Sequence, residues 1–189
     1  MTETQTDPDA GSALRLFVAV QLPDQAFRTV KRALSGHGQL LKLLPGSLHL
    51  TLRFLGDVPG SRIGEVEEAL ASASGPPDFP LRLAPLGVFK KRRTTVLWAG
   101  LGPSPELTAL KMKVDRAVGQ LDMDFKADRA VFAPHLTLAR LRPNDPKPPA
   151  EPWSIRPRGI FMVRHFGLYS SVLRPEGAVH TLVREYTLS

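Results

Sequence analysis

Hydrophobic and polar residues alternate along several short stretches of the chain, as they do in β-strands that bury one face. Two of these stretches have the same sequence, because residues 49–52 and residues 135–138 both read His-Leu-Thr-Leu. In an extended strand the histidine and threonine share one face, and the two leucines share the other. The pattern therefore predicts two matching strands, one in each half of the chain, that bury leucines and present a histidine with a threonine.

Other stretches show the same alternation or apolar residues spaced three and four apart, as in amphipathic helices. Strands are expected over residues 14–22, 81–89, 94–101, 159–170 and 179–188. Helices are expected over residues 25–34, 61–72 and 105–121, with Asp24, Ser61 and Ser104 as their N-caps. This order predicts an α+β protein. We expect a bilobal, pseudo-twofold arrangement of two facing antiparallel sheets, with helices on the outside and an active-site cleft between the sheets.

The chain is expected to have two parts. Residues 1–12 are polar and acidic, and we expect them to form a disordered tail. Residues 13–189 are expected to form a single bilobal domain. Within it, residues 142–149 are too rich in proline for a helix or a strand and are expected to form a loop.

Composition points to a cytoplasmic protein. The chain contains no cysteine, and no apolar run approaches the ~20 residues that a membrane span requires. The first residues also lack the basic and then apolar layout of a secretion signal. We therefore expect no membrane partner.

The charge balance favours an anionic partner. The formal net charge is +7, and nucleic-acid phosphate is the commonest partner of such a protein. Four consecutive basic residues, Lys90 to Arg93, are expected in a hairpin loop. This tetrad is either a solvated turn or, close to a phosphate-binding cleft, a contact for RNA.

The repeated motif suits acid–base chemistry at phosphorus. Imidazole exchanges a proton near neutral pH, so of His49 and His135 one can serve as acid and the other as base of an in-line displacement. The hydroxyls of Thr51 and Thr137 can donate hydrogen bonds to the non-bridging phosphate oxygens. A metal site made of two histidines and two threonines would be unusual. We therefore expect catalysis without a metal or another cofactor.

Four segments of the chain carry a resemblance to a known family: residues 15–23, 48–56, 132–140 and 168–173. They resemble the bacterial RNA 2′,3′-cyclic phosphodiesterases, first described as 2′-5′ RNA ligases, of the two-histidine phosphoesterase superfamily. The resemblance extends from about residue 14 to the C-terminus. It implies a bilobal fold of two facing sheets and hydrolysis of a terminal 2′,3′-cyclic phosphate to a 2′-phosphate.

The resemblance also implies roles for individual residues. His49 would protonate the departing 3′ oxygen, His135 would activate water, and Arg140 would bind phosphate together with Thr51 and Thr137. The residues themselves leave the assignment of acid and base open, because a pseudo-symmetric site looks alike from both sides.

Strand parity conflicts with the implied role of Arg140. A residue five positions after His135 points away from it in a regular strand. Arg140 therefore needs a strand that ends or bulges after Leu138, or a side chain that reaches around the edge. Strand parity instead places Arg53 on the face of His49. There it would either contact RNA or face solvent. Phe54 is expected to stack on a base or to pack in the core.

Two other functions remain open from the sequence. The chain could join RNA ends in the reverse reaction, giving a 2′-5′ linkage, or it could bind RNA ends without turnover. The expected partner is RNA with a 2′,3′-cyclic phosphate end, or small cyclic nucleotides, bound by a monomer. The remaining histidines, His37, His165 and His180, are expected to be structural, although relatives often carry tyrosine in place of His180.

Overall fold

The computed structural model describes residues 12–35, 48–74, 77–125, 131–145, 147–174 and 177–188, with the side chain of Lys91 excepted. The predicted tail lies outside these ranges apart from Ser12, and so does His37. The elements follow in the order β1 (Leu14–Gln21), α1 (Asp24–Leu34), β2 (His49–Val58), a 3-10 turn (Gly60–Arg62), α2 (Ile63–Ala71), β3 (Phe79–Lys91), β4 (Thr94–Leu101), α3 (Pro105–Gly119), β5 (His135–Leu141), a second 3-10 turn (Pro152–Ser154), β6 (Ile160–Val163), β7 (His165–Arg174) and β8 (Gly177–Thr187).

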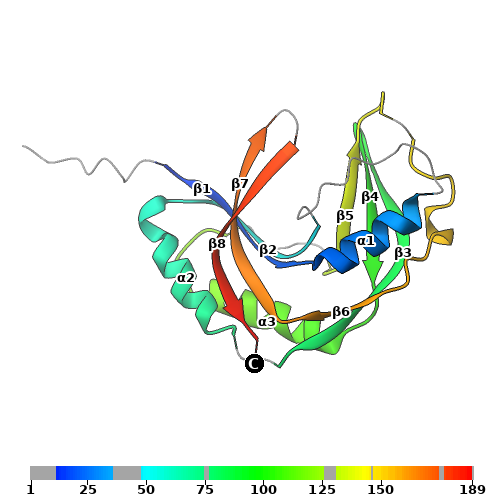
Figure 1. Ribbon diagram of the computed structural model, residues 1–189. Coiled ribbons are helices and arrows are strands. Elements are labelled where there is room, and N and C mark those ends of the chain that lie inside the picture. The colour runs from blue at the N-terminus through cyan, green and yellow to red at the C-terminus, as the bar shows by residue number, and fades with distance from the viewer. Residues whose placement is uncertain are drawn as a thin grey trace, which may run out of the picture.

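The strands form a curled antiparallel sheet in the order β6-β3-β4-β5-β2-β1-β7-β8. The curl makes the β6-β3-β4-β5 half face the β2-β1-β7-β8 half (Figure 1). The α+β class and the facing halves are thus confirmed. The halves are continuous, because the motif strands β2 and β5 are neighbours at the centre, paired at Leu50 and Leu136.

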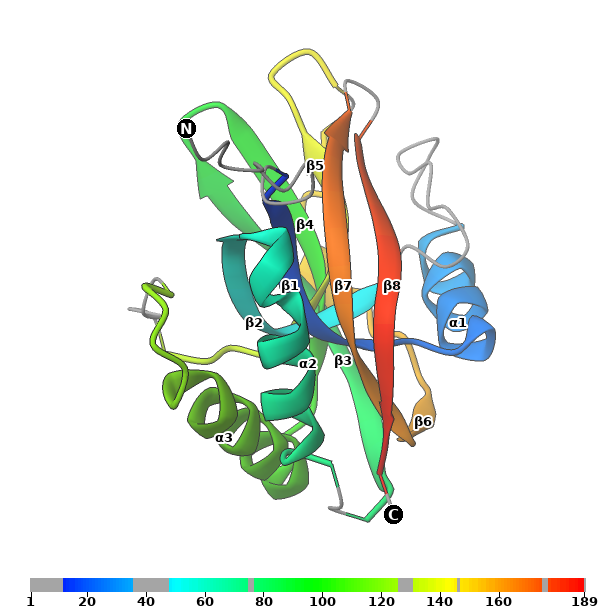
Figure 2. The same cartoon turned by 90° about the vertical axis from the view of Figure 1, so that its left-hand side faces the viewer.

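The helices lie on the outer side of this curled sheet (Figure 2). Helix α3 contacts β2, α2 contacts β8, and α1 contacts β6. The hydroxyl of Tyr186 on β8 donates a hydrogen bond to the carbonyl of Glu67 on α2 at 3.0 Å. The helices thereby cover the apolar face of the sheet and leave the opposite face for polar groups. No helix in the described ranges is long and apolar enough to span a bilayer.

The helix starts match the sequence predictions only in part. Ser104 is the N-cap of α3, because its hydroxyl accepts a hydrogen bond from the N–H of Leu107 at 3.1 Å. The predicted cap at Asp24 is wrong. Pro23 occupies that position and its carbonyl accepts from Ala26, so the carboxylate of Asp24 lies in the first turn, where the helix dipole favours it.

The start of α2 also differs from the prediction. The 3-10 turn (Gly60–Arg62) comes before the helix, which begins at Ile63 with Arg62 at the cap position. Ser61 therefore lies inside the turn and does not cap α2.

Candidate active site

The two motifs place leucines and polar residues on opposite faces of the sheet, as the alternation predicts. Leu50, Leu52, Leu136 and Leu138 are buried in the core under the helices. His49, Thr51, His135 and Thr137 are half-buried on the other face, which we call the site face. Because β2 and β5 adjoin at the centre of the sheet, the histidines and threonines of both halves are brought together there.

Each motif histidine lies against a stacked aromatic pair. Phe17 packs on His49 with ring centroids 5.1 Å apart and stacks on Tyr169 at 5.5 Å. On the other half, Phe89 meets the ring of His135 at 5.3 Å and stacks on Trp98 at 5.1 Å. The two halves thus repeat the motif and also the aromatic support that holds each imidazole in place.

A β-bulge in β5 resolves the position of Arg140. Thr137 lies opposite Trp98 and Ala139 lies opposite Leu97, so Leu138 is an extra residue in the pairing of β5 with β4. The bulge shifts parity by one residue, and Arg140 comes onto the face of His135 and Thr137. The conflict between strand parity and the implied phosphate contact is therefore removed by a bulge after Thr137.

The first motif has the same bulge. Thr51 lies opposite Ala19 and Arg53 lies opposite Val18, so Leu52 is the extra residue in the pairing of β2 with β1. Phe54 consequently lies on the site face, exposed, with its ring 6.1 Å from that of Phe17.

The same bulge overturns the parity argument for Arg53. Its guanidinium lies on the helix side of the sheet, 3.7 Å from the carboxylate of Asp115 on α3. Lys111, which also pairs with Asp115 at 2.6 Å, is buried beneath Phe132. Arg53 is therefore part of the packing between β2 and α3.

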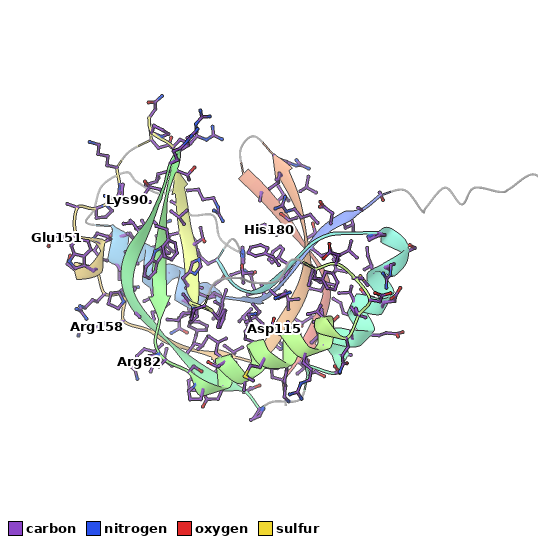
Figure 3. All side chains as sticks on the ribbon, turned by 180° about the vertical axis from the view of Figure 1, so that it is seen from behind. Arg82, Lys90, Asp115, Glu151, Arg158 and His180 are labelled. Carbon is purple, nitrogen blue, oxygen red and sulfur yellow. The ribbon has the colours of Figure 1, made fainter. Side chains whose placement is uncertain are left out.

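His180 on β8 is a further residue of the site that the sequence analysis placed among structural histidines. Its ring meets that of His49 edge to face, with centroids 5.0 Å apart, and meets Phe17 at 4.9 Å. It points from its strand toward the facing half of the sheet (Figure 3). Burial and, second, the positive charge of Arg140 lower the pKa of His180 below its ordinary value.

The backbone sets the orientation of the His135 ring. Nδ1 lies 2.8 Å from the carbonyl oxygen of Ala133. A carbonyl oxygen only accepts hydrogen bonds, so Nδ1 carries a proton. In the neutral ring Nε2 is then left with a free lone pair, which is the form that a general base requires.

The site face thus gathers three imidazoles, two hydroxyls and one guanidinium. Such a set can donate hydrogen bonds to an anion, and it can give and take protons on opposite sides of it. Among the described residues, no three histidine, aspartate or glutamate side chains are grouped as potential metal ligands.

Comparisons with known proteins place the chain in a family. The model of the 2′-5′ RNA ligase superfamily matches residues 19–173. A protein of Archaeoglobus fulgidus named RNA 2′,3′-cyclic phosphodiesterase is 32% identical over 183 residues, which cover 92% of this chain and 99% of the relative. The chain belongs to the 2′-5′ RNA ligase superfamily.

Solved structures agree with this placement. The crystal structure of TT0787 of Thermus thermophilus matches with a TM-score of 0.76 and 28% identity, over 93% of this chain and 98% of that one. The crystal structure of E. coli LigT complexed with 3′-AMP matches with a TM-score of 0.73 and 26% identity, over 94% and 99% of the two chains.

Proposed function

We propose that this protein is an RNA 2′,3′-cyclic phosphodiesterase, which hydrolyses the cyclic phosphate at an RNA end to a 2′-phosphomonoester. The observation that carries the proposal is the repeated pair of His49 with Thr51 and His135 with Thr137 on one face of the sheet. The name of the Archaeoglobus relative and the nucleotide in the LigT complex support the same substrate class. The protein acts as a monomer in the cytoplasm.

In the proposed reaction, a water molecule attacks phosphorus while the bond between phosphorus and the 3′ oxygen breaks. Nε2 of His135 accepts a proton from the water, and His49 donates a proton to the departing 3′ oxygen. The hydrogen bond between Nδ1 of His135 and the Ala133 carbonyl supports the role of base, since it leaves Nε2 as the accepting atom. Both protons are thereby accounted for without a metal ion or cofactor.

The remaining groups stabilise negative charge on the phosphate. The hydroxyls of Thr51 and Thr137 donate hydrogen bonds to the non-bridging oxygens, and the guanidinium of Arg140 adds a positive charge on the same face. Phe54, which is exposed on this face, offers a flat apolar surface for a base.

The test uses an oligoribonucleotide that ends in a 2′,3′-cyclic phosphate. The terminal phosphate after incubation is identified by phosphorus NMR, and we expect a 2′-phosphomonoester. A 3′-phosphomonoester would contradict the assigned leaving group. A 2′-5′ linked product formed from two RNA ends would instead show ligation, which the family name also suggests. Binding of the RNA end without any product would show a binding module.

A further inference from the structure

His180 and Arg140 approach the same region from opposite halves of the molecule. His180 is on β8, at the outer edge of one half, and Arg140 is on β5 in the other half. The bulge at Leu138 brings Arg140 onto the site face, and the ring contact with His49 fixes His180 there. The two side chains are close enough for the charge of Arg140 to disfavour protonation of His180.

An imidazole and a guanidinium on one face can together bind an anion. In the described part of the chain, neither His180 nor Arg140 has a carboxylate partner within ion-pair distance. An anion between them would oppose the effect of the Arg140 charge on His180, because a negative charge favours the protonated imidazole. A protonated imidazole and a guanidinium both donate charge-assisted hydrogen bonds to phosphate oxygens.

We propose that His180 and Arg140 form a clamp for the substrate phosphate across the two halves of the sheet, and that His180 takes up a proton when the phosphate binds. The proposal rests on the proposed function. It adds a binding residue outside both motifs and a link between substrate binding and pH.

The test must distinguish His180 from the other titratable groups that surround it. His49 faces it from β2, Arg140 from β5, and Tyr169 lies beyond Phe17 on β7. Of these, only His49 is also an imidazole. Its signal must therefore be separated from that of His180.

The first experiment measures anion binding without turnover. Sulfate serves as the probe, because its charge does not change near neutral pH. The ring protons of His180 are followed by NMR across pH with and without sulfate, and the His180→Phe variant assigns them. We expect sulfate to raise the pKa of His180 and to bind more tightly as pH falls. In His180→Phe, this part of the pH dependence should disappear.

The second experiment measures turnover of a cyclic phosphate, whose single charge is also constant with pH. His180→Phe retains the ring contacts with Phe17 and His49 but has no nitrogen. We expect it to raise KM about tenfold, with a smaller effect on kcat, since it loses a charge-assisted hydrogen bond. The wild-type KM should rise as pH increases above the pKa of His180 in the free enzyme, and it should level off above its raised pKa in the complex. The variant should lack this rise.

His180→Tyr is the matched variant, since a phenol donates a hydrogen bond without changing charge. We expect it to recover part of the affinity but not the pH dependence. An unchanged pKa of His180 in saturating sulfate would overturn the clamp, as would an equal KM in wild type and His180→Phe. If the wild type hydrolyses no cyclic phosphate, the proposed function fails, and the sulfate titration still decides the clamp.

Discussion

Nδ1 of His135 lies 2.8 Å from the backbone carbonyl of Ala133, two residues earlier in the chain. Ala133 precedes Pro134, and the residue before a proline is restricted to extended conformations. The carbonyl that selects the tautomer is thus held by the local sequence. It orients the imidazole, and no carboxylate of the described residues forms an ion pair with the ring.

The first prediction concerns this tautomer. Neutral His135 should carry its proton on Nδ1, because the carbonyl of Ala133 only accepts hydrogen bonds. Long-range nitrogen–proton NMR of the neutral ring distinguishes the two tautomers directly. A proton on Nε2 would contradict the proposed base, since that ring would have no lone pair directed at water.

The second prediction concerns the motif histidines. His49→Ala and His135→Ala should each lower kcat by about 10²- to 10⁴-fold, the usual contribution of a general acid or base. His165→Ala is the control, because His165 is exposed at the start of β7. Thermal unfolding of all three variants checks that the fold is intact. A loss of less than tenfold in either motif variant would rule out its role.

The third prediction concerns the threonines. Thr51→Val and Thr137→Val should each lower kcat/KM by about 10- to 100-fold, the effect of one hydrogen bond to a charged group. The loss should stay below that of the histidine variants, because the hydroxyls transfer no proton. Thr51→Ser and Thr137→Ser keep the hydroxyl and should recover most activity. Equal losses in the valine and serine variants would point to packing instead of hydrogen bonding.

The fourth prediction is that hydrolysis survives excess EDTA. Among the described residues, contacts of His49 and His135 include aromatic rings, the His180 imidazole and a backbone carbonyl, and the proposed proton transfers use only imidazoles. Turnover before and after prolonged dialysis against the chelator provides the measurement. Loss of activity with recovery on adding zinc or manganese would show that a metal takes part.

The fifth prediction concerns a basic pocket of about 240 Å³ between the β3–β4 hairpin and the segment after β5. Its lining includes Arg92, Arg93, Arg142 and Lys147, and one carboxylate, that of Asp145, which accepts from the N–H of Arg142 at 2.7 Å. The basic stretch Lys90 to Arg93, predicted to form the whole hairpin loop, is split between two elements. Lys90 lies in β3, and Arg92 and Arg93 form the turn. If this pocket holds upstream RNA phosphates, glutamine at its four basic positions should weaken binding of long RNA only.

The comparison uses KM for a long oligonucleotide and for a mononucleotide 2′,3′-cyclic phosphate. The pocket variant should raise the first and leave the second unchanged. The negative slope of log(kcat/KM) against log salt should become shallower by about 0.7 for each phosphate that the variant no longer binds. Glutamine at Lys31, Arg32, Lys113 and Arg116, all exposed on the outer helices, gives the same charge change as a control. Equal effects of both variants would show that the hairpin is a solvated turn.

The sequence predicts those features that depend on neighbouring residues. Alternation within four residues is enough to place the leucines in the core and the histidines and threonines on the site face. Ser104 followed by Pro105 likewise marks the start of α3. These signals are local, so no knowledge of the sheet order is needed.

The features that sequence reasoning missed depend on pairing between distant segments. The alternation of hydrophobic and polar residues does not show a bulge at Leu52 or Leu138, because a bulge is defined by the pairing with the partner strand. The strands of His180 and His49 are separated by β1 and β7 in the sheet, and their rings meet because the sheet curls (Figure 1). Lys111 lies on a helix face that resembles a solvated one, and it is buried because Asp115 and Phe132 cover it.

The matched bulges at Leu52 and Leu138 give the site a direction. A frame with twofold symmetry accepts a ligand equally well in either of two orientations. The bulges bring the fifth residue after each histidine onto the site face, and these residues differ, Phe54 in one half and Arg140 in the other. An aromatic ring on one side and a cation on the other make the two orientations unequal in energy, so in the proposed function a nucleotide would enter with its base and its phosphate on fixed sides. The two identical His-Leu-Thr-Leu segments can then serve as general acid and general base. The inserted residues Leu52 and Leu138 place Phe54 on the face of one histidine and Arg140 on the face of the other.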